Sequence, residues 1–410
     1  MHNHYSLPPF EIQDSSTSLN KSRMTNITLV MVMPNITLHS FEGTHYEIGI
    51  QQGRAVRGLI HKALEEIPKF EAIKSIKPKL LPTSLFLALA KRRATKLLKG
   101  DIFEYYPKQA QRLEGIAKGA EIDLQNLLFM QSIELLPAVR ESDYRLEACT
   151  SLGVGPKRTT TEETIVAKNF DYPPDFAPYH LTCNTKPTEG YQTLGCTMAP
   201  LPGMLDGMNE CGLSVTYNFP DSMDVPNNFV PLSMVLQEML ESCKTTDEAV
   251  KFLIKAKRGG QGGLLMLADA GNEIRAVEIT SNHAAVRETR EGHIINTNSF
   301  QTTEMQRYEI PHSAVFVDLN LKVHESSEQR FKRAQALLKG KAKMGENEIA
   351  SIMRDHGEDN KPSIMTVCRH GPSREFSTTL RSMIIYPNRR AIKVLYGNPC
   401  QNEYTEFTFS

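Results

Sequence analysis

Apolar residues recur at near-helical spacing through the first third of the chain. In residues 45–70 they mark one face of an amphipathic helix. These positions are Ile48, Ile50, Val56, Ile60, Leu64 and Ile67. Residues 81–136 continue the pattern and predict two or three further helices, whereas residues 25–43, rich in β-branched side chains, predict strands broken at Pro34.

After Cys149 the pattern changes to short strand-like runs separated by Gly, Pro and Asn. Helical patterns interrupt these runs at 231–243 and 246–257, and again at 326–340, with Ser326 or Ser327 as candidate N-caps, and at 347–357. Strands return between these helices and close the chain at 378–399. This order of strands, helices, strands, helices and strands favours an α+β fold with large antiparallel sheets and helices layered outside.

Composition describes an ordinary globular protein. The 410 residues are 40% hydrophobic and 23% charged, with 47 basic and 47 acidic side chains. A zero net charge gives no support for nucleic-acid binding, so no nucleic-acid partner is expected. No apolar run reaches the ~20 residues that span a bilayer, so no membrane partner is expected. Residues 27–33 are interpreted as a strand, residues 1–23 as a disordered tail, and the default location is cytoplasmic.

The seven cysteines are dispersed along the chain, without CxxC pairs or histidines at ligand spacing. This arrangement argues against a disulfide framework and against a zinc site. The glycine-rich run 259–263 follows a helix and has no GK[ST] sequence, so it predicts a loop rather than a phosphate-binding site. Neither a metal nor a cofactor is therefore expected.

Cys149 stands where the helical region meets the strand-like region, and Thr150 and Ser151 follow it. A lone cysteine is more often a buried packing residue than a nucleophile. Asn169 and Asp171 follow on the next strand-like run, "TIVAKNFDY". Such polar residues are costly in a buried sheet unless they are paired, although the end of this strand facing solvent would account for them equally well.

Asn218, Asn298 and Arg369 also end apolar runs. Each has an ordinary alternative, because Asn is common where strands end and a solvated Arg is common anywhere. Together with Cys149 they supply a nucleophile and hydrogen-bond donors for an oxyanion, but no base. His283, His293 and His370 carry no surrounding motif. A chain cut before Cys149 would supply its own α-amine, with an ordinary pKa of about 7.7–8.0, as the base.

An ordered series of motifs resembles one known family. The motifs are "GTHYEIGIQQGRAVR", "LEGIAKGAEIDLQNLL", "CTSLGV", "AKNFDY", "GMNECGLSVTYN", "HIINTNSF" and "SIMTVCRHGP". From about residue 40 to about residue 400 the chain resembles the isopenicillin N acyltransferase family, a group of N-terminal-nucleophile (Ntn) hydrolases. It is more distantly similar to penicillin V acylases and bile salt hydrolases.

The resemblance implies an αββα sandwich of two mostly antiparallel sheets flanked by helices. It implies self-cleavage between Ala148 and Cys149, which would leave a small chain of residues 24–148 and a catalytic chain of residues 149–410 that stay associated. Cys149 would be the nucleophile. Ala148 stands where the acyltransferase has Gly.

The same resemblance assigns further roles to the motif residues. Asp171 would orient the nucleophile and Arg369 would occupy the family's arginine position. Asn298 would be the principal oxyanion donor, with Asn218 as a second one. Lys168, where the penicillin V acylases have Arg, and Asn169 would support the site.

The function that we expect is a self-processing N-terminal-cysteine amidohydrolase acting on a linear, non-peptide C–N bond of a small molecule. One alternative is an acyltransferase that uses acyl-coenzyme A as co-substrate and a small amine as acceptor. Another is an uncleaved protein that binds without catalysis. Association into a homo-oligomer is left open.

Overall fold

The computed structural model describes residues 36–69, 77–78, 80–135, 148–289, 291–316, 321–373 and 376–409. The expected tail at 1–23 and the expected strand at 27–33 lie outside these residues. Residues 136–147, directly before Ala148, also lie outside them. Among the described residues, no helix is both long enough and apolar enough to cross a membrane.

Two large sheets form the centre of the molecule. In the eight-stranded sheet the spatial order is β1 (Leu38–Gly43), β4 (His180–Pro187), β5 (Thr193–Met198), β6 (Asp206–Asn209), β7 (Ser214–Asn218), β8 (Gly263–Ala268), β9 (Ile274–Ile279) and β10 (Ala284–Glu288). In the six-stranded sheet it is β11 (His293–Asn296), β2 (Ala148–Val154), β3 (Ile165–Tyr172), β14 (Thr378–Tyr386), β15 (Ala391–Tyr396) and β16 (Thr405–Thr408). Every neighbouring pair is antiparallel except β1 and β4.

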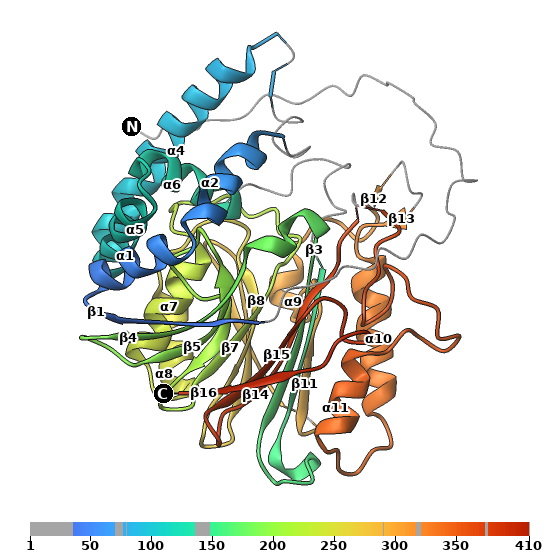
Figure 1. Ribbon diagram of the computed structural model, residues 1–410. Coiled ribbons are helices and arrows are strands. Elements are labelled where there is room, and N and C mark those ends of the chain that lie inside the picture. The colour runs from blue at the N-terminus through green and yellow to red at the C-terminus, as the bar shows by residue number, and fades with distance from the viewer. Residues whose placement is uncertain are drawn as a thin grey trace.

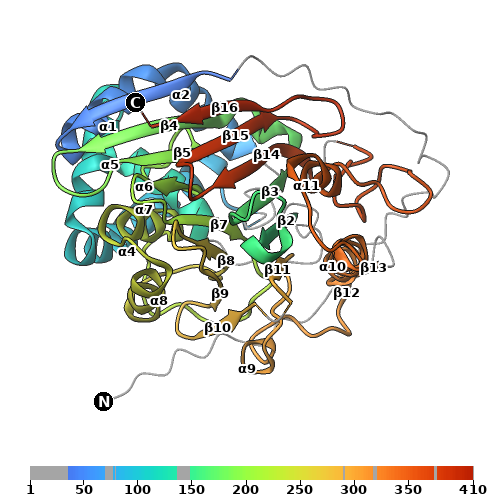
Figure 2. The ribbon, with the colours of Figure 1, turned by 90° about the horizontal axis from the view of Figure 1, so that it is seen from below.

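Helices cover the outer face of each sheet. Outside the eight-stranded sheet lie α1 (His45–Ala55), α2 (Arg57–Glu66), α4 (Thr83–Tyr105), α5 (Pro107–Ala120), α6 (Leu124–Gln131), α7 (Leu232–Ser242) and α8 (Thr246–Lys255). Outside the six-stranded sheet lie α10 (Glu325–Leu338) and α11 (Glu346–Met353) (Figures 1 and 2). The short α9 (Thr303–Gln306) and the hairpin β12 (Val315–Phe316)–β13 (Leu321–Lys322) lie in the connections.

Three buried hydrophobic clusters correspond to the three interfaces between these layers. The first joins the α1–α8 helices to the eight-stranded sheet, with Ile48, Leu113 and Val215 as members. The second fills the space between the sheets, with Val166 of β3 and Met266 of β8 as members. The third joins the six-stranded sheet to α10 and α11. The arrangement is an αββα sandwich, so the predicted fold class is confirmed.

The helical layer is held closely together by glycines in two of the sequence motifs. Gly49 of α1 and Gly115 of α5 face each other where the two helices cross. A Cβ at Gly49 would lie 2.2 Å from the Arg112 carbonyl oxygen, and one at Gly115 would lie 2.2 Å from the Tyr46 carbonyl oxygen. Only glycine permits this close approach of two helix backbones.

Two local predictions differ from the structure. The helical pattern at 45–70 forms two helices, α1 and α2, which meet at Val56. The N-cap of α10 is His324, so the prediction of Ser326 or Ser327 at that position is wrong. Both serines lie inside the first turns of α10, and their hydroxyls bind elements of the site described below.

Candidate active site

Cys149 is the second residue of β2, which lies between β11 and β3 in the six-stranded sheet. Its partner across the β2–β3 ladder is Phe170, so both side chains lie on the same face of the sheet. Cys149 is buried, and its side chain forms part of the wall of a pocket. Burial raises the pKa of its thiol, whereas the Lys168 cation and a hydrogen bond from the Asp171 backbone N–H lower it.

The pocket encloses about 910 Å³, part of which is open to solvent. It is mostly apolar, and many of its walls are aromatic: Phe170, Tyr172, Phe176, Tyr179, Tyr217 and Phe219. Two acidic residues are among those that line it, Asp171 and Glu134. Both oxygens of Glu134 accept hydrogen bonds of 2.7 Å from the backbone N–H and the hydroxyl of Ser233. Such a lining suits a hydrocarbon or aromatic group better than a strongly polar one.

Asn298 follows β11 and binds the backbone of Cys149. Its Oδ1 accepts a hydrogen bond of 3.0 Å from the Cys149 backbone N–H and one of 2.7 Å from Arg330 Nη2. Both partners can only donate, so the orientation of the amide group is determined. Nδ2 therefore points the other way, where it donates to the carbonyl oxygen of Phe219 at 2.8 Å. Among the described residues, the second Nδ2 hydrogen has no hydrogen-bond acceptor.

Arg330 of α10 is a site residue that the sequence did not identify. Its side chain is 1% exposed. Besides Asn298, its guanidinium donates to the Cys149 carbonyl oxygen and, at 2.9 Å, to the hydroxyl of Thr150. In the sequence it is one of several basic residues on a helix, and no pattern distinguishes it from Lys332 or Arg333.

Asp171 lies at the end of β3, opposite Ala148 in the β2–β3 ladder. Its Oδ1 accepts a hydrogen bond of 2.7 Å from the hydroxyl of Thr379, whereas its buried Oδ2 has no hydrogen-bond partner in the described part of the chain. Burial raises the pKa of this carboxyl, and the cations Arg330 and Arg369 act in the opposite direction. Burial among positive charges lowers the pKa of Arg369 to about 9.

Arg369 is placed by its neighbours rather than by direct contact with Cys149. Its guanidinium donates to the Ser326 hydroxyl at 2.7 Å and to the Ser377 carbonyl oxygen at 3.2 Å. Thr379 links Arg369 to Asp171, because its hydroxyl accepts a hydrogen bond from the Arg369 backbone N–H and donates one to Asp171 Oδ1. The predicted Asp171 and Arg369 are thus brought into one electrostatic cluster.

Asn218 of the eight-stranded sheet and Lys168 of the six-stranded sheet together support the segment that leads to Asn298. Lys168 Nζ donates to Asn218 Oδ1 at 2.9 Å. Asn218 Nδ2 donates to the carbonyl oxygens of Asn296 and Thr297 at 3.1 and 3.0 Å. Both of its amide hydrogens are therefore engaged in holding the segment that leads to Asn298.

Asn169 points to the other face of β3, as the alternation of a strand requires. Its Nδ2 donates to the carbonyl oxygens of Met353 and Val367, both at 2.9 Å. It joins β3 to the end of α11 and to the segment before Arg369. No histidine lies among the described residues of the pocket wall.

The family model described as "Acyl-coenzyme A:6-aminopenicillanic acid acyl-transferase" matches residues 158–401, more than half of the chain. The chain belongs to this family. The matched region contains Lys168, Asp171, Asn218, Asn298 and Arg369, and begins after Cys149. The family comprises acyl-transferring and amide-hydrolysing enzymes of the Ntn class.

A curated relative supports the assignment. The chain is 24% identical over 243 residues to a β-alanyl-dopamine/carcinine hydrolase of Drosophila melanogaster. The alignment spans 56% of this chain and 56% of that protein, so only about half of the relative's length is matched.

Solved structures with 14–16% sequence identity are also similar. A penicillin V acylase from Agrobacterium tumefaciens has a TM-score of 0.41 and covers 60% of this chain and 83% of its own. An N-acylethanolamine-hydrolyzing acid amidase orthologue from Caenorhabditis elegans has a TM-score of 0.40, with 58% and 93% covered. A conjugated bile acid hydrolase from Clostridium perfringens also has a TM-score of 0.40, with 64% and 97% covered.

One further, partly buried carboxyl of this family member interacts with a residue of the site. Asp221 follows β7, and its charge interacts with that of Arg330. Burial raises the pKa of Asp221 to about 7. Because the folded protein binds this proton more tightly than the unfolded chain does, the stabilisation is complete at low pH. It is lost as the pH rises from about 4 through 7.

We expect Asp221→Asn to stabilise the protein more at pH 8 than at pH 5, by a difference on the order of 2 kcal/mol. The amide cannot ionise, so it avoids the cost of a buried carboxylate. Thermal unfolding at the two pH values measures this difference. The exposed Asp247→Asn on α8 is the control. An equal effect of Asp221→Asn at both pH values would contradict the prediction.

Proposed function

We propose that this protein is a self-processing amidohydrolase whose nucleophile is Cys149. In the first step the Cys149 thiol attacks the carbonyl carbon of Ala148, and the acyl group moves from the Cys149 nitrogen to its sulfur. Water then hydrolyses the resulting thioester. The products are a carboxylate at Ala148 and a free α-amine on Cys149, and the two chains stay together in the sandwich.

In turnover the α-amine of Cys149 takes the proton of its own thiol. The thiolate attacks the amide carbonyl carbon of the substrate. The resulting tetrahedral oxyanion accepts a hydrogen bond from the second N–H of Asn298 Nδ2. Collapse of the tetrahedral intermediate breaks the C–N bond and forms the acyl-thioester. The leaving amine takes the proton that the Cys149 α-amine had accepted from the thiol. Water then releases the acid. Arg330 and Asp171 hold the Cys149 backbone and the α-amine in register.

The observation that carries this proposal is the placement of the two reacting groups of Cys149. Its thiol lies at the wall of the pocket, and its backbone nitrogen is held 3.0 Å from Asn298 Oδ1. After cleavage the same nitrogen would be the amine base, already oriented by a hydrogen bond. The pocket wall supplies no histidine among its described residues, which favours the amine as base.

The lining of the pocket indicates the substrate class. Most of its walls are aromatic or aliphatic, so we propose that it binds the hydrocarbon or aromatic part of a linear amide. The Drosophila relative is named as a hydrolase of β-alanyl-dopamine and carcinine. Glu134, whose pKa burial raises and the hydrogen bonds from Ser233 lower, is the carboxyl that a bound ammonium group would meet.

Self-cleavage is tested by intact mass and N-terminal sequencing of the purified protein. We expect two fragments, one of which begins at Cys149. If the chain stays full-length on prolonged incubation and no thiol-directed substrate analogue labels it, the proposal fails and the uncleaved binding protein is favoured.

A second measurement distinguishes hydrolysis from acyl transfer, in which water or an amine, respectively, reacts with the acyl-enzyme. The processed protein is given aliphatic, aromatic and β-alanyl amides, and also acyl-coenzyme A with a small amine. We expect free acid from the hydrocarbon or aromatic amides. If a new amide forms from acyl-coenzyme A faster than free acid is released, the protein is an acyltransferase instead.

A further inference from the structure

A second cluster of reactive side chains includes the two residues that flank Arg369 in the chain. It consists of His356, Cys368, His370 and Cys400. These residues come from three segments: the loop after α11, the segment that carries Arg369, and the loop after β15. Both cysteines are free thiols. The proposed hydrolysis uses none of the four.

The distances within the cluster match those between ligands of a tetrahedral metal. One potential ligand atom from each residue lies within 4.8 Å of all the others. His370 Nε2 is 3.4 Å from Cys368 Sγ and 3.4 Å from Cys400 Sγ. Zinc–ligand bonds of about 2.3 Å to sulfur and about 2.0 Å to nitrogen give a sulfur–nitrogen separation of ~3.5 Å at the tetrahedral angle.

A buried nitrogen atom without a hydrogen-bond partner among the described residues also supports metal binding here. His356 Nε2 is buried and has no hydrogen-bond partner among the described residues. The rings of His356 and His370 stand nearly perpendicular, with centroids 5.0 Å apart. A buried imidazole nitrogen without a partner is costly, and coordination of a metal ion would satisfy it.

We propose that His356, Cys368, His370 and Cys400 form a Cys2His2 site for a structural zinc ion. Two thiolates and two neutral imidazoles are the ligand set that zinc prefers, and four protein ligands leave no position for a substrate. Binding displaces the thiol protons to solvent. Cys400 lies at the surface, so the ion has a path to the site.

The site would fix the segment that positions Arg369. Cys368 and His370 flank Arg369 in the chain, so ligation of both by one ion would fix the backbone on either side of Arg369. The loop that carries Cys400 also holds this segment, because Asn398 Nδ2 donates to the Arg369 carbonyl oxygen at 2.8 Å. The backbone carbonyl oxygen of Asp355, beside His356, accepts a hydrogen bond of 3.0 Å from the Cys368 backbone N–H.

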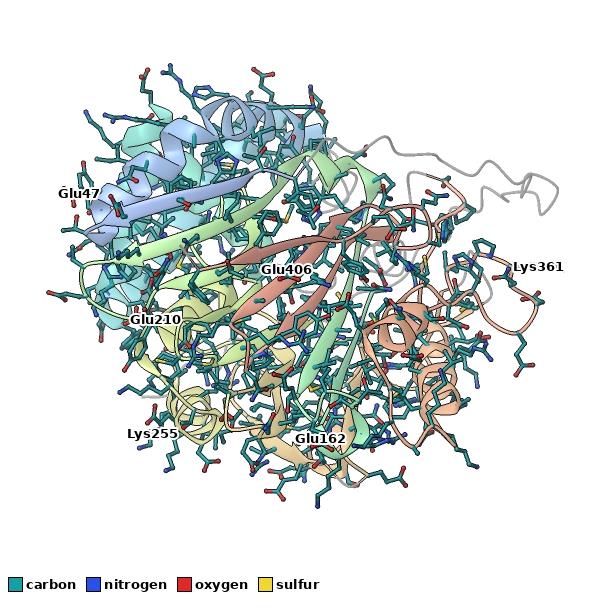
Figure 3. The ribbon with its side chains drawn as sticks, turned by 60° about the horizontal axis from the view of Figure 1, so that its bottom comes forward. Glu47, Glu162, Glu210, Lys255, Lys361 and Glu406 are labelled. Carbon is teal, nitrogen blue, oxygen red and sulfur yellow. The ribbon has the colours of Figure 1, made fainter. Side chains whose placement is uncertain are left out.

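The spacing of cysteines and histidines along the chain argues against a zinc site, because these four ligands are mostly far apart in the sequence. His356 and Cys400 are separated by two strands, β14 and β15, and only the Cys368-x-His370 pair is local. The folded chain brings the ligands together near the loop that follows α11. In Figure 3 the labelled Lys361 of this loop projects into solvent at the edge of the molecule.

A second group, Glu309, His312 and His324, carries no such proposal. Both ring nitrogens of His324 already have partners, the Ser299 hydroxyl at 3.0 Å and the Ile310 carbonyl oxygen at 2.7 Å. A metal there would have to displace these hydrogen bonds.

Metal analysis of untagged full-length protein, purified without chelator, tests the proposal. We expect about one zinc per chain by elemental mass spectrometry. Replacement with Co²⁺ should give the intense visible bands of tetrahedral thiolate coordination. Cys400→Ser should lose the zinc and these bands. Because Cys400 is at the surface, this variant is expected to fold even if a Cys368 variant does not.

Cys211→Ser is the matched control, because Cys211 is partly exposed and belongs to neither group of metal-ligating side chains. It should keep the full zinc content. The proposal is overturned if the wild-type protein neither contains zinc nor binds added Zn²⁺ at micromolar concentration. It is also overturned if Cys400→Ser keeps the metal, or if the intact mass shows a Cys368–Cys400 disulfide in place of it.

Discussion

A Cys149→Ala variant is expected to remain a single full-length chain and to hydrolyse no amide. Both reactions begin with the attack of the Cys149 sulfur on a carbonyl carbon, at Ala148 in the precursor and in the substrate afterwards. Removal of a nucleophile from an acyl-transfer site lowers the rate by on the order of 10⁴- to 10⁶-fold. Denaturing electrophoresis, intact mass and release of free acid measure the two losses.

The fold should survive this change. Cys149 is small, and alanine leaves only a minor cavity at the pocket wall, with a stability cost of about 1 kcal/mol. Cys211→Ala is the matched control and should cleave and hydrolyse as the wild type does. A Cys149→Ala chain that still separates between residues 148 and 149 would show that another group performs the cleavage. The assignment of Cys149 would then be wrong.

The fold was predictable because its layers have different sequence patterns. Helical spacing before Cys149 and β-branched runs after it correspond to the outer helical layer and to the two sheets. Motif glycines such as Gly49 and Gly115 mark a helix crossing that no other residue allows. What periodicity does not supply is the order of strands in space, since β2 pairs with β11 from almost 150 residues away.

The site was predictable only where a residue interrupts an apolar strand. Asp171 and Lys168 stand out in β3 because buried charges are rare in a sheet. Ser327 gave a misleading signal: it resembles a helix cap, but its hydroxyl accepts the Asn298 backbone N–H at 2.9 Å. Arg330 gave no signal, because a basic residue in a polar helix normally faces solvent. Only tertiary packing turns it inward.

Replacement of this arginine is expected to have the second large effect. In Arg330→Met the side chain keeps its approximate length, but the Cys149 carbonyl oxygen and Asn298 Oδ1 each lose a donor. Loss of one charged partner from a buried cluster destabilises a fold by about 3–5 kcal/mol. Loss of the orientation of Asn298 should also lower the rate of hydrolysis roughly 100- to 1000-fold, as loss of an oxyanion donor does.

The pH profile distinguishes this role from a purely structural one. Arg330 is the strongest charge that lowers the pKa of Asp171, so its removal raises that pKa. The carboxylate then forms only at higher pH, and the acidic limb of the activity profile should move upward. Arg330→Lys keeps the positive charge but not the fork of donors, so it should restore the limb without restoring the full rate. Lys332→Met is the control on α10, because its side chain is 75% exposed and should change neither quantity. If Arg330→Met lowers the stability but leaves the acidic limb of the activity profile unchanged, the role of Arg330 is structural only.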